Sequence, residues 1–110
     1  MAGTSAKVSR ALFKEVFIGG QSVHSSLFTV KTIVKTGLPV SFSVVVSAKV
    51  AKKAVKRNLI KRRVRAVLTQ LKSQLKPGSV IIVFTKSTIN TASYGEIRDQ
   101  LVTNLKPLTI

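Results

Sequence analysis

The segment from Lys52 to Leu75 separates apolar from cationic side chains at the period of an α-helix. At about 100° per residue, one arc of about 100° collects six apolar side chains, which are Ile60, Val64, Val67, Leu68, Leu71 and Leu75. A neighbouring arc holds Asn58, Lys61, Arg62 and Arg65, with Arg57 at its border. A helix with one apolar face is stable when that face is buried against another element. The pattern therefore predicts a long helix that packs on a sheet and leaves a basic flank in solvent.

The remaining segments predict a small sheet and two shorter helices. Residues 27–34, 40–47 and 80–85 are rich in β-branched and aromatic residues, as strands are, and the last run is continuous enough for a central strand. Ser9 precedes a helical pattern over 10–18, and Ser93 with Glu96 fits a capping box that opens a last helix. The predicted order is α-β-β-α-β-α. We therefore expect an α+β fold, a two-layer α-β sandwich with a small mixed sheet, in which residues 1–8 form a flexible N-terminal segment and residues 9–110 a single domain.

The charge of the chain is large and unevenly distributed. It has 19 Lys and Arg residues against 3 acidic residues, a formal net charge of +16. The acids are Glu15, Glu96 and Asp99, so no carboxylate side chain lies between residues 16 and 95, whereas nine basic residues lie between Lys49 and Arg65. Because so few carboxylates are present to neutralise this charge, we interpret it as a surface for a polyanion rather than an ordinary solvated face. The pattern alone does not distinguish RNA from DNA.

The sequence offers no site for protein-borne catalysis. Cysteine is absent, His24 is the single histidine, and the three acids are too widely spaced for a two-metal nuclease site. We expect no catalytic residue, no metal site and no cofactor bound by the protein alone. The longest apolar run, Val80 to Phe84, is far shorter than a membrane span, and residues 1–20 lack the apolar block of a secretory signal. We therefore expect a cytoplasmic protein without a membrane partner.

Residues 47–65 resemble the signature of the protein component of bacterial ribonuclease P. The segment reads Ser47-Ala-Lys-Val-Ala-Lys-Lys-Ala-Val-Lys-Arg-Asn-Leu-Ile-Lys-Arg-Arg-Val-Arg65, with Ala-Val, Arg-Asn, Lys-Arg and a final Arg at the family's spacing. The Phe-Lys-Glu-Val-Phe run at 13–17, followed by Gly20, is similar to the family's first helix, and Tyr94 with Glu96 is similar to the opening of its last helix. The resemblance extends over about residues 9–105.

This resemblance implies a fold and a division of labour. The fold would be the family's α-β sandwich, in which one βαβ crossover is left-handed. The catalytic RNA subunit, with Mg²⁺, would hydrolyse the phosphodiester bond that releases the 5′ leader of precursor tRNA. The protein would be an accessory subunit of this endoribonuclease that binds the catalytic RNA and the leader, with no protein partner implied.

Two sets of site residues follow from the charge pattern and the resemblance. In the RNA-binding set, Arg57, Asn58, Lys61, Arg62 and Arg65 match the family's RNA-contacting motif, and the basic run adds Lys49, Lys52, Lys53 and Lys56. The set that lines a cleft for the leader is Phe13, Phe17 and Lys31. Lys31 stands where some members have an aromatic residue, so a phosphate contact can replace base stacking there. Phe13 and Phe17 lie four residues apart, a spacing that is also typical of core packing, and we expect one ring to be packed and the other to line the cleft.

Two other functions fit the same composition. A structural RNA-binding protein, such as a ribosomal protein, is also a small basic α-β domain. A DNA-binding module could place the basic helix in a major groove. The second alternative is weaker because the apolar face of this helix is needed for packing.

Overall fold

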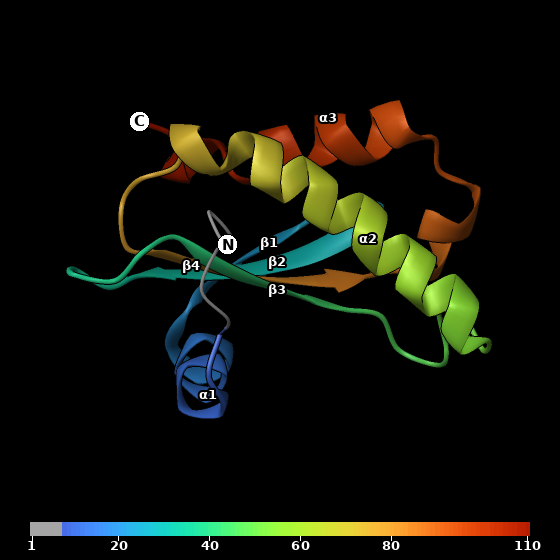
Figure 1. Ribbon diagram of the computed structural model, residues 1–110, viewed down its shortest axis with the longest axis horizontal. Coiled ribbons are helices and arrows are strands. Elements are labelled where there is room, and N and C mark those ends of the chain that lie inside the picture. The colour runs from blue at the N-terminus through green and yellow to red at the C-terminus, as the bar shows by residue number, and fades with distance from the viewer. Residues whose placement is uncertain (1–7) are drawn as a thin grey trace.

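The computed structural model describes residues 8–110, so the predicted flexible segment 1–8 lies, apart from Val8, outside the described residues. The described part contains three α-helices and a four-stranded sheet (Figure 1). In chain order the elements are α1 (Arg10–Gly19), β1 (Gln21–His24), β2 (Phe28–Val34), β3 (Ser41–Val45), α2 (Ala54–Leu71), β4 (Ser79–Thr85) and α3 (Tyr94–Asn104). Short 3₁₀ turns η1 (Lys72–Gln74), η2 (Ser87–Thr91) and η3 (Lys106–Leu108) follow α2, β4 and α3.

The sheet is mixed, with strand order β1-β2-β4-β3. β2 pairs antiparallel with both β1 and β4, whereas β3 pairs parallel with β4. The connection between the parallel strands passes through α2. In Figure 1 both strands run from left to right, α2 returns above the sheet, and β4 lies behind β3. This βαβ crossover is therefore left-handed, contrary to the general preference for right-handed crossovers.

The predicted fold class is confirmed, with one strand more than the predicted order. The additional strand is β1, which pairs with the middle of β2, from Gln21 opposite Thr32 to His24 opposite Thr29. Only Val23 among its four residues is apolar. Such a short polar edge strand lacks the alternation of apolar residues by which strands are recognised.

The long helix is shorter than predicted at both ends. Its first residue is Ala54 rather than Lys52, because the chain before it forms a turn that buries Val50 and Ala51. At the other end, Leu75 has an extended backbone and pairs with Thr109 in an isolated β-bridge. The predicted caps are confirmed: Ser9 accepts a hydrogen bond from the backbone of α1, and Ser93 forms a complete capping box at α3. No helix within residues 8–110 is both long and apolar enough to cross a membrane.

The two faces of the sheet carry separate cores. The main core lies between one face and the helices α2 and α3. It includes all six apolar residues predicted for the buried face of the long helix, although the last, Leu75, lies beyond the end of α2. On the other face Val16 of α1 packs with Val80 and Ile82 of β4. Figure 1 shows this arrangement, with α2 and α3 above the sheet and α1 below it. The apolar face of α2 is thus fully used by the fold, and its basic flank is left for other contacts.

Two glycines with positive φ give a matched test of this fold. Gly78 (φ +87) precedes β4, and a Cβ at this position would lie 2.4 Å from the carbonyl oxygen of Lys35. Gly37 (φ +92) has no atom within 4 Å of the corresponding position. We predict that Gly37→Ala lowers the free energy of unfolding by about 1 kcal/mol, the cost of a left-handed backbone. Gly78→Ala should cost about 1–3 kcal/mol more, because the methyl group also displaces a backbone carbonyl. Urea unfolding of both variants measures the difference, and equal losses would contradict this account.

Candidate nucleic-acid interface

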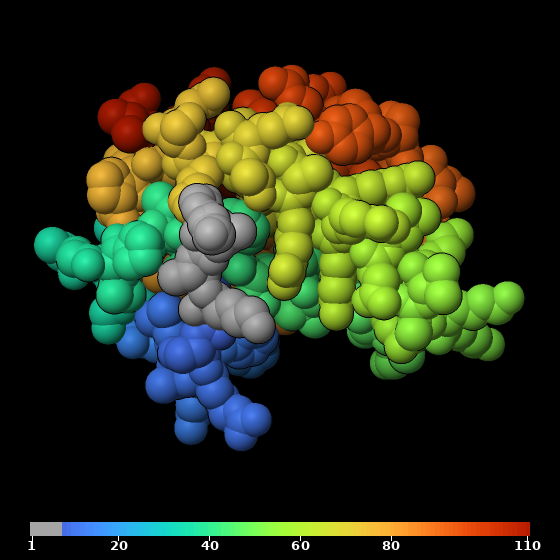
Figure 2. All heavy atoms as spheres, viewed as in Figure 1, coloured from blue at the N-terminus to red at the C-terminus, as the bar shows by residue number. Residues whose placement is uncertain are grey.

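The predicted RNA-binding residues lie in the β3–α2 connection and in α2 as far as Arg65, and we call them the basic surface. The set is Lys49, Lys52, Lys53, Lys56, Arg57, Asn58, Lys61, Arg62 and Arg65. Each of these side chains is exposed or half-buried. Among the described residues, none of the eight cations in this set pairs with a carboxylate. In Figure 2 the yellow-green segment that carries them projects at one end of the molecule.

The N-terminus of α2 adds to the positive potential of this basic surface. Lys53 occupies the N-cap position without a side-chain hydrogen bond, and the first turn contains no acidic residue. The N-terminal end of a helix dipole is positive, so Lys52, Lys53 and Lys56 at this end are unfavourable within the isolated protein. The side chain of Val55 in the same turn is 81% exposed, which leaves the helix end accessible. This arrangement is favourable when an anion, such as a phosphate, lies at the helix end.

Further along α2, Asn58, Lys61, Arg62 and Arg65 line a shallow depression on the helix flank. These are the four residues that the helical period placed in one arc. Arg can bind a phosphate with two parallel hydrogen bonds, Lys binds as a point charge, and the Asn amide can both donate and accept. The depression therefore has the chemistry to hold a phosphodiester backbone together with a sugar or base edge.

Arg57 differs from the other members of the basic surface because its guanidinium contacts the protein backbone. Its Nη1 atom donates hydrogen bonds to the carbonyl oxygens of Ala51 at 3.0 Å and Lys52 at 2.7 Å. The side chain is half-buried between α2 and the segment that leads into it. The sequence pattern gave no sign of these bonds, because they depend on the turn before α2.

The predicted cleft residues Phe13, Phe17 and Lys31 lie together on the opposite face of the sheet, with one further aromatic residue. The rings of Phe13 and Phe17 are stacked with centroids 6.4 Å apart, and Phe84 of β4 meets them edge-on at 6.1 and 6.0 Å. The Nζ atom of Lys31 lies 5.0 Å from the centroid of the Phe17 ring. Phe13 is half-buried against the small core, whereas Phe17 is 51% exposed. One ring is thus packed and the other open to solvent. We call these four residues the aromatic cluster.

Sequence reasoning missed Phe84 as a member of the aromatic cluster. Its signal was present in the alternation of β4, since Phe84 points to the same face as Val80 and Ile82, which face α1. In the sheet register, Phe84 lies opposite Thr29 on one side and Val45 on the other. Val45 is the last residue of β3, two residues before the segment that carries Lys49. Through β3, the chain therefore passes from a residue opposite Phe84 of the aromatic cluster to the start of the basic surface at Lys49.

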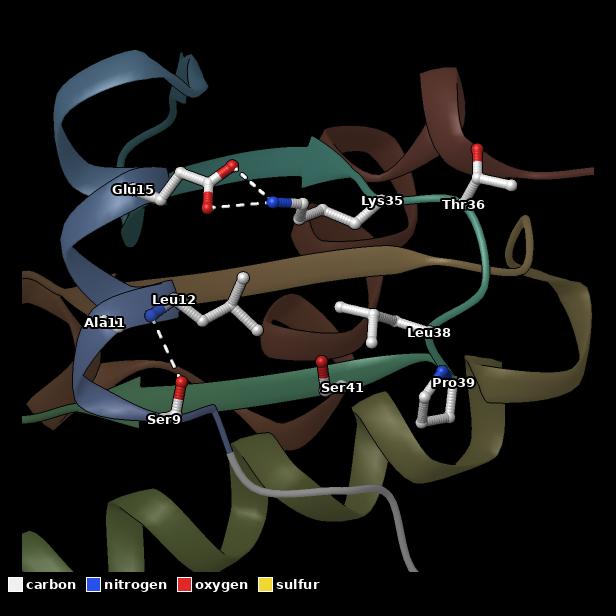
Figure 3. Close-up of a pocket in the computed structure, with 9 residues that line it drawn as sticks. All are labelled: Ser9, Ala11, Leu12, Glu15, Lys35, Thr36, Leu38, Pro39 and Ser41. Carbon is white, nitrogen blue, oxygen red and sulfur yellow. Dashed lines mark hydrogen bonds and ion pairs between the residues drawn. The ribbon is translucent and has the colours of Figure 1, made fainter.

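A separate pocket lies between α1 and the turn that joins β2 to β3 (Figure 3). Leu12 and Leu38 point toward each other across it, and Lys35 Nζ pairs with the Glu15 carboxylate at 2.9 and 3.0 Å. The pocket contains none of the predicted site residues and lies on the flank of α1 away from Phe13 and Phe17. Because its two charged groups compensate each other, it lacks the excess charge of a polyanion site.

Two of the three acidic side chains, Glu15 and Glu96, make structural contacts. Glu15 pairs with Lys35, and Glu96 accepts a hydrogen bond from the backbone of Ser93 in the capping box. Within residues 8–110, no group of three or more His, Asp or Glu side chains could hold a metal ion. The exposed cations and aromatic rings of this part of the chain are suited to binding anions and aromatic bases.

Comparisons with known proteins point to one family. The family model described as Ribonuclease P matches residues 7–109 of the chain. The ribonuclease P protein component of Ligilactobacillus salivarius is 37% identical over 99 residues, covering 87% of this chain and 85% of that protein. The corresponding protein of a Pseudanabaena species is 34% identical over 90 residues, covering 81% of this chain and 78% of that protein.

Solved structures agree with this result. The RNase P protein of Staphylococcus aureus superposes with a TM-score of 0.82 at 26% identity, covering 94% of this chain and 95% of that chain. The RNase P protein of Thermotoga maritima, at 24% identity, shares the fold with a TM-score of 0.78, covering 89% of this chain and 92% of that chain.

The uncompensated charge of the basic surface predicts that specific anions stabilise the protein. Sulfate at millimolar concentration should raise the melting temperature more than sodium chloride at equal ionic strength. The reason is that an anion bound only to the native state stabilises it by mass action, whereas chloride mainly screens repulsion. The melting temperature is measured by thermal unfolding in sodium sulfate and in sodium chloride at equal ionic strength. If matched chloride stabilises the protein as well as sulfate does, the surface has no anion site and only general repulsion is relieved.

Proposed function

Because the chain belongs to the ribonuclease P protein family, we propose that it binds the catalytic RNA of ribonuclease P and the 5′ leader of precursor tRNA, and so assists removal of the leader. Family membership makes it a protein component of an endoribonuclease and makes the RNA subunit its partner. Beyond family membership, we propose that the chain contacts the catalytic RNA and the precursor tRNA directly and that it is located in the cytoplasm.

The observation that carries the proposal is the basic surface without counter-charges. Eight cations gather in the β3–α2 connection and in α2 as far as Arg65, where they repel one another and the helix dipole opposes those at the first turn. Phosphates of a structured RNA would relieve this repulsion, and each neutralised phosphate releases counterions from the RNA. The surface is an extended flank rather than an enclosed pocket, which suits a folded RNA better than a small anion.

The aromatic cluster supports contact with a single-stranded leader. A half-exposed ring such as Phe17 offers a face on which a base can stack whatever its identity. Lys31 beside this ring can bind the adjoining phosphate. Sequence-tolerant contacts of this kind suit an enzyme that processes many different precursor tRNAs.

We assign the chemical step to the RNA subunit, whose Mg²⁺ ions would activate water and stabilise the leaving oxygen. The side chains of this chain bind and orient instead. Lys61, Arg62 and Arg65 would neutralise phosphates that otherwise require additional cations when RNA subunit and substrate meet. The protein would therefore lower the Mg²⁺ concentration at which the holoenzyme works.

Reconstitution tests this function directly. Purified protein added to a catalytic ribonuclease P RNA at low Mg²⁺ should restore cleavage of precursor tRNA at the junction of leader and mature tRNA. The protein alone should not cleave the substrate. The measurement is cleavage of end-labelled precursor tRNA across a Mg²⁺ series. Absence of stimulation would overturn the proposal and favour a structural RNA-binding role, as in a ribosomal protein.

The proposed leader contact predicts a selective defect in Phe17→Ala. Loss of one stacked base costs about 1–3 kcal/mol, so we expect the holoenzyme to bind precursor tRNA about fivefold to a hundredfold more weakly. Binding of mature tRNA, which has no leader, should be unchanged. Val102→Ala is the control, because Val102 is also an exposed apolar side chain but lies on α3, outside both the aromatic cluster and the basic surface. Equal losses for precursor and mature tRNA would contradict a leader contact.

A further inference from the structure

Three lysines of the basic surface lie on irregular backbone rather than on α2. Residues 47–53 join β3 to α2 and carry Lys49, Lys52 and Lys53, all of which are exposed. The segment begins with a turn in which the carbonyl oxygen of Ser47 accepts hydrogen bonds from the backbone N–H groups at positions 50 and 51, at 3.0 and 3.2 Å. The directions of these three lysine side chains therefore depend on the contacts that hold the backbone of residues 50–53 in place.

Two side chains bind three consecutive carbonyl groups of this segment. From the side of η2, the Asn90 amide nitrogen donates to the carbonyl oxygen of Val50 at 2.7 Å, and to that of Ser87 in its own turn at 3.1 Å. From the side of α2, Arg57 donates to the carbonyl oxygens of Ala51 and Lys52 at 3.0 and 2.7 Å. The segment is thus held between two elements that belong to the rigid part of the fold.

We propose that Asn90 and Arg57 are positioning residues for RNA binding, which act by holding residues 47–53 so that Lys49, Lys52 and Lys53 meet the RNA. The inference rests on the proposed function. A segment that is already ordered loses less conformational freedom when it binds, so its lysines contribute more to affinity. For Arg57 this is a different role from direct phosphate contact, since one of its two terminal nitrogens is committed to the backbone. Asn90 lies outside the 47–65 motif, and its sequence context does not indicate a role in RNA binding.

The variant Asn90→Ala tests the proposal because it removes no charge. We expect its affinity for the ribonuclease P RNA to fall about fivefold, the equivalent of one hydrogen bond. The slope of log affinity against log salt should also fall, by about 0.7–0.9 for each lysine–phosphate contact that is lost. A neutral substitution that only destabilises the fold would lower the melting temperature and leave this slope unchanged.

Thr91→Ala is the matched control for Asn90→Ala. Thr91 lies in the same 3₁₀ turn, and its hydroxyl donates to the carbonyl oxygen of Thr88 at 3.3 Å rather than to the 47–53 segment. We expect this variant to bind RNA with the wild-type affinity and slope. If both variants behave alike when measured well below their melting temperatures, the positioning role of Asn90 is wrong.

A double-mutant cycle tests Arg57 and does not depend on the folding of Asn90→Ala. In a background in which Lys49, Lys52 and Lys53 are all replaced by Ala, a residue that acts through these lysines loses most of its effect. We therefore expect Arg57→Ala to weaken RNA binding in the wild-type background and to have little further effect in the triple-Ala background. Arg62→Ala should weaken binding about equally in both, because Arg62 lies in the depression further along α2. An Arg57→Ala effect that is fully additive would show direct contact and overturn the proposal for this residue.

The wild-type protein separates failure of this inference from failure of the proposed function. If the wild-type protein does not bind the ribonuclease P RNA in a salt-dependent way, the proposed function is wrong. If it binds, but Asn90→Ala keeps the full salt slope and Arg57→Ala is additive, only the positioning role is wrong.

Discussion

Burial of one face of α2 against the sheet is the interaction on which the rest of the structure depends. Ile60, Val64, Val67, Leu68 and Leu71 are all buried in the main core. Because a helix is rigid, fixing this face also fixes the direction of every other side chain on it. Asn58, Lys61, Arg62 and Arg65 therefore lie on one flank because the buried face of the same helix sets their directions. The fold positions the basic surface through its apolar core, and the surface itself contributes repulsion.

The N-terminus of α2 is unfavourable for the protein alone, and the proposed phosphate contact accounts for this. The N-terminus of α2 has no side-chain cap and no acidic residue, although a single Asp or Ser at the N-cap would stabilise the helix by about 1 kcal/mol. By contrast, α1 and α3 begin with serine caps, and α3 has a complete capping box. An acidic cap on α2 would compete with phosphate for the same N–H groups. Among the three described α-helices, the one proposed to contact RNA is thus the one whose N-terminus has no side-chain cap.

The parts of the structure that the sequence predicted are those governed by local patterns. The buried face of α2 follows from a 3.6-residue period, and the caps at Ser9 and Ser93 from side chains three residues from their partners. β1 was not predicted because its single apolar residue gives no alternation. The backbone contacts of Arg57 were not predicted because they depend on the turn before α2. The contact of Asn90 was not predicted because it joins residues 40 positions apart in the chain. Phe84 was recognised as part of a strand, but its place beside Phe13 and Phe17 requires knowledge of which face α1 covers. The left-handed crossover was implied only by the family resemblance, since general rules favour the opposite hand.

The hand of this crossover determines that the aromatic cluster is accessible. With the same strand order, a right-handed connection from β3 to β4 would carry α2 across the face of the sheet that α1 occupies. Val45, Ile82 and Phe84 point to that face, so α2 would cover the end of it that α1 leaves open. In the left-handed arrangement α2 packs on the other face, and Phe17 remains half exposed beside Phe84. The two proposed RNA contacts then lie on different elements, the basic surface on the β3–α2 connection and α2, and the aromatic cluster on α1, β2 and β4. β3 links them along the chain, since Val45 at its end lies opposite Phe84 and the basic surface begins four residues later at Lys49. An open face beside Phe17 is what the proposed contact with a single-stranded leader requires.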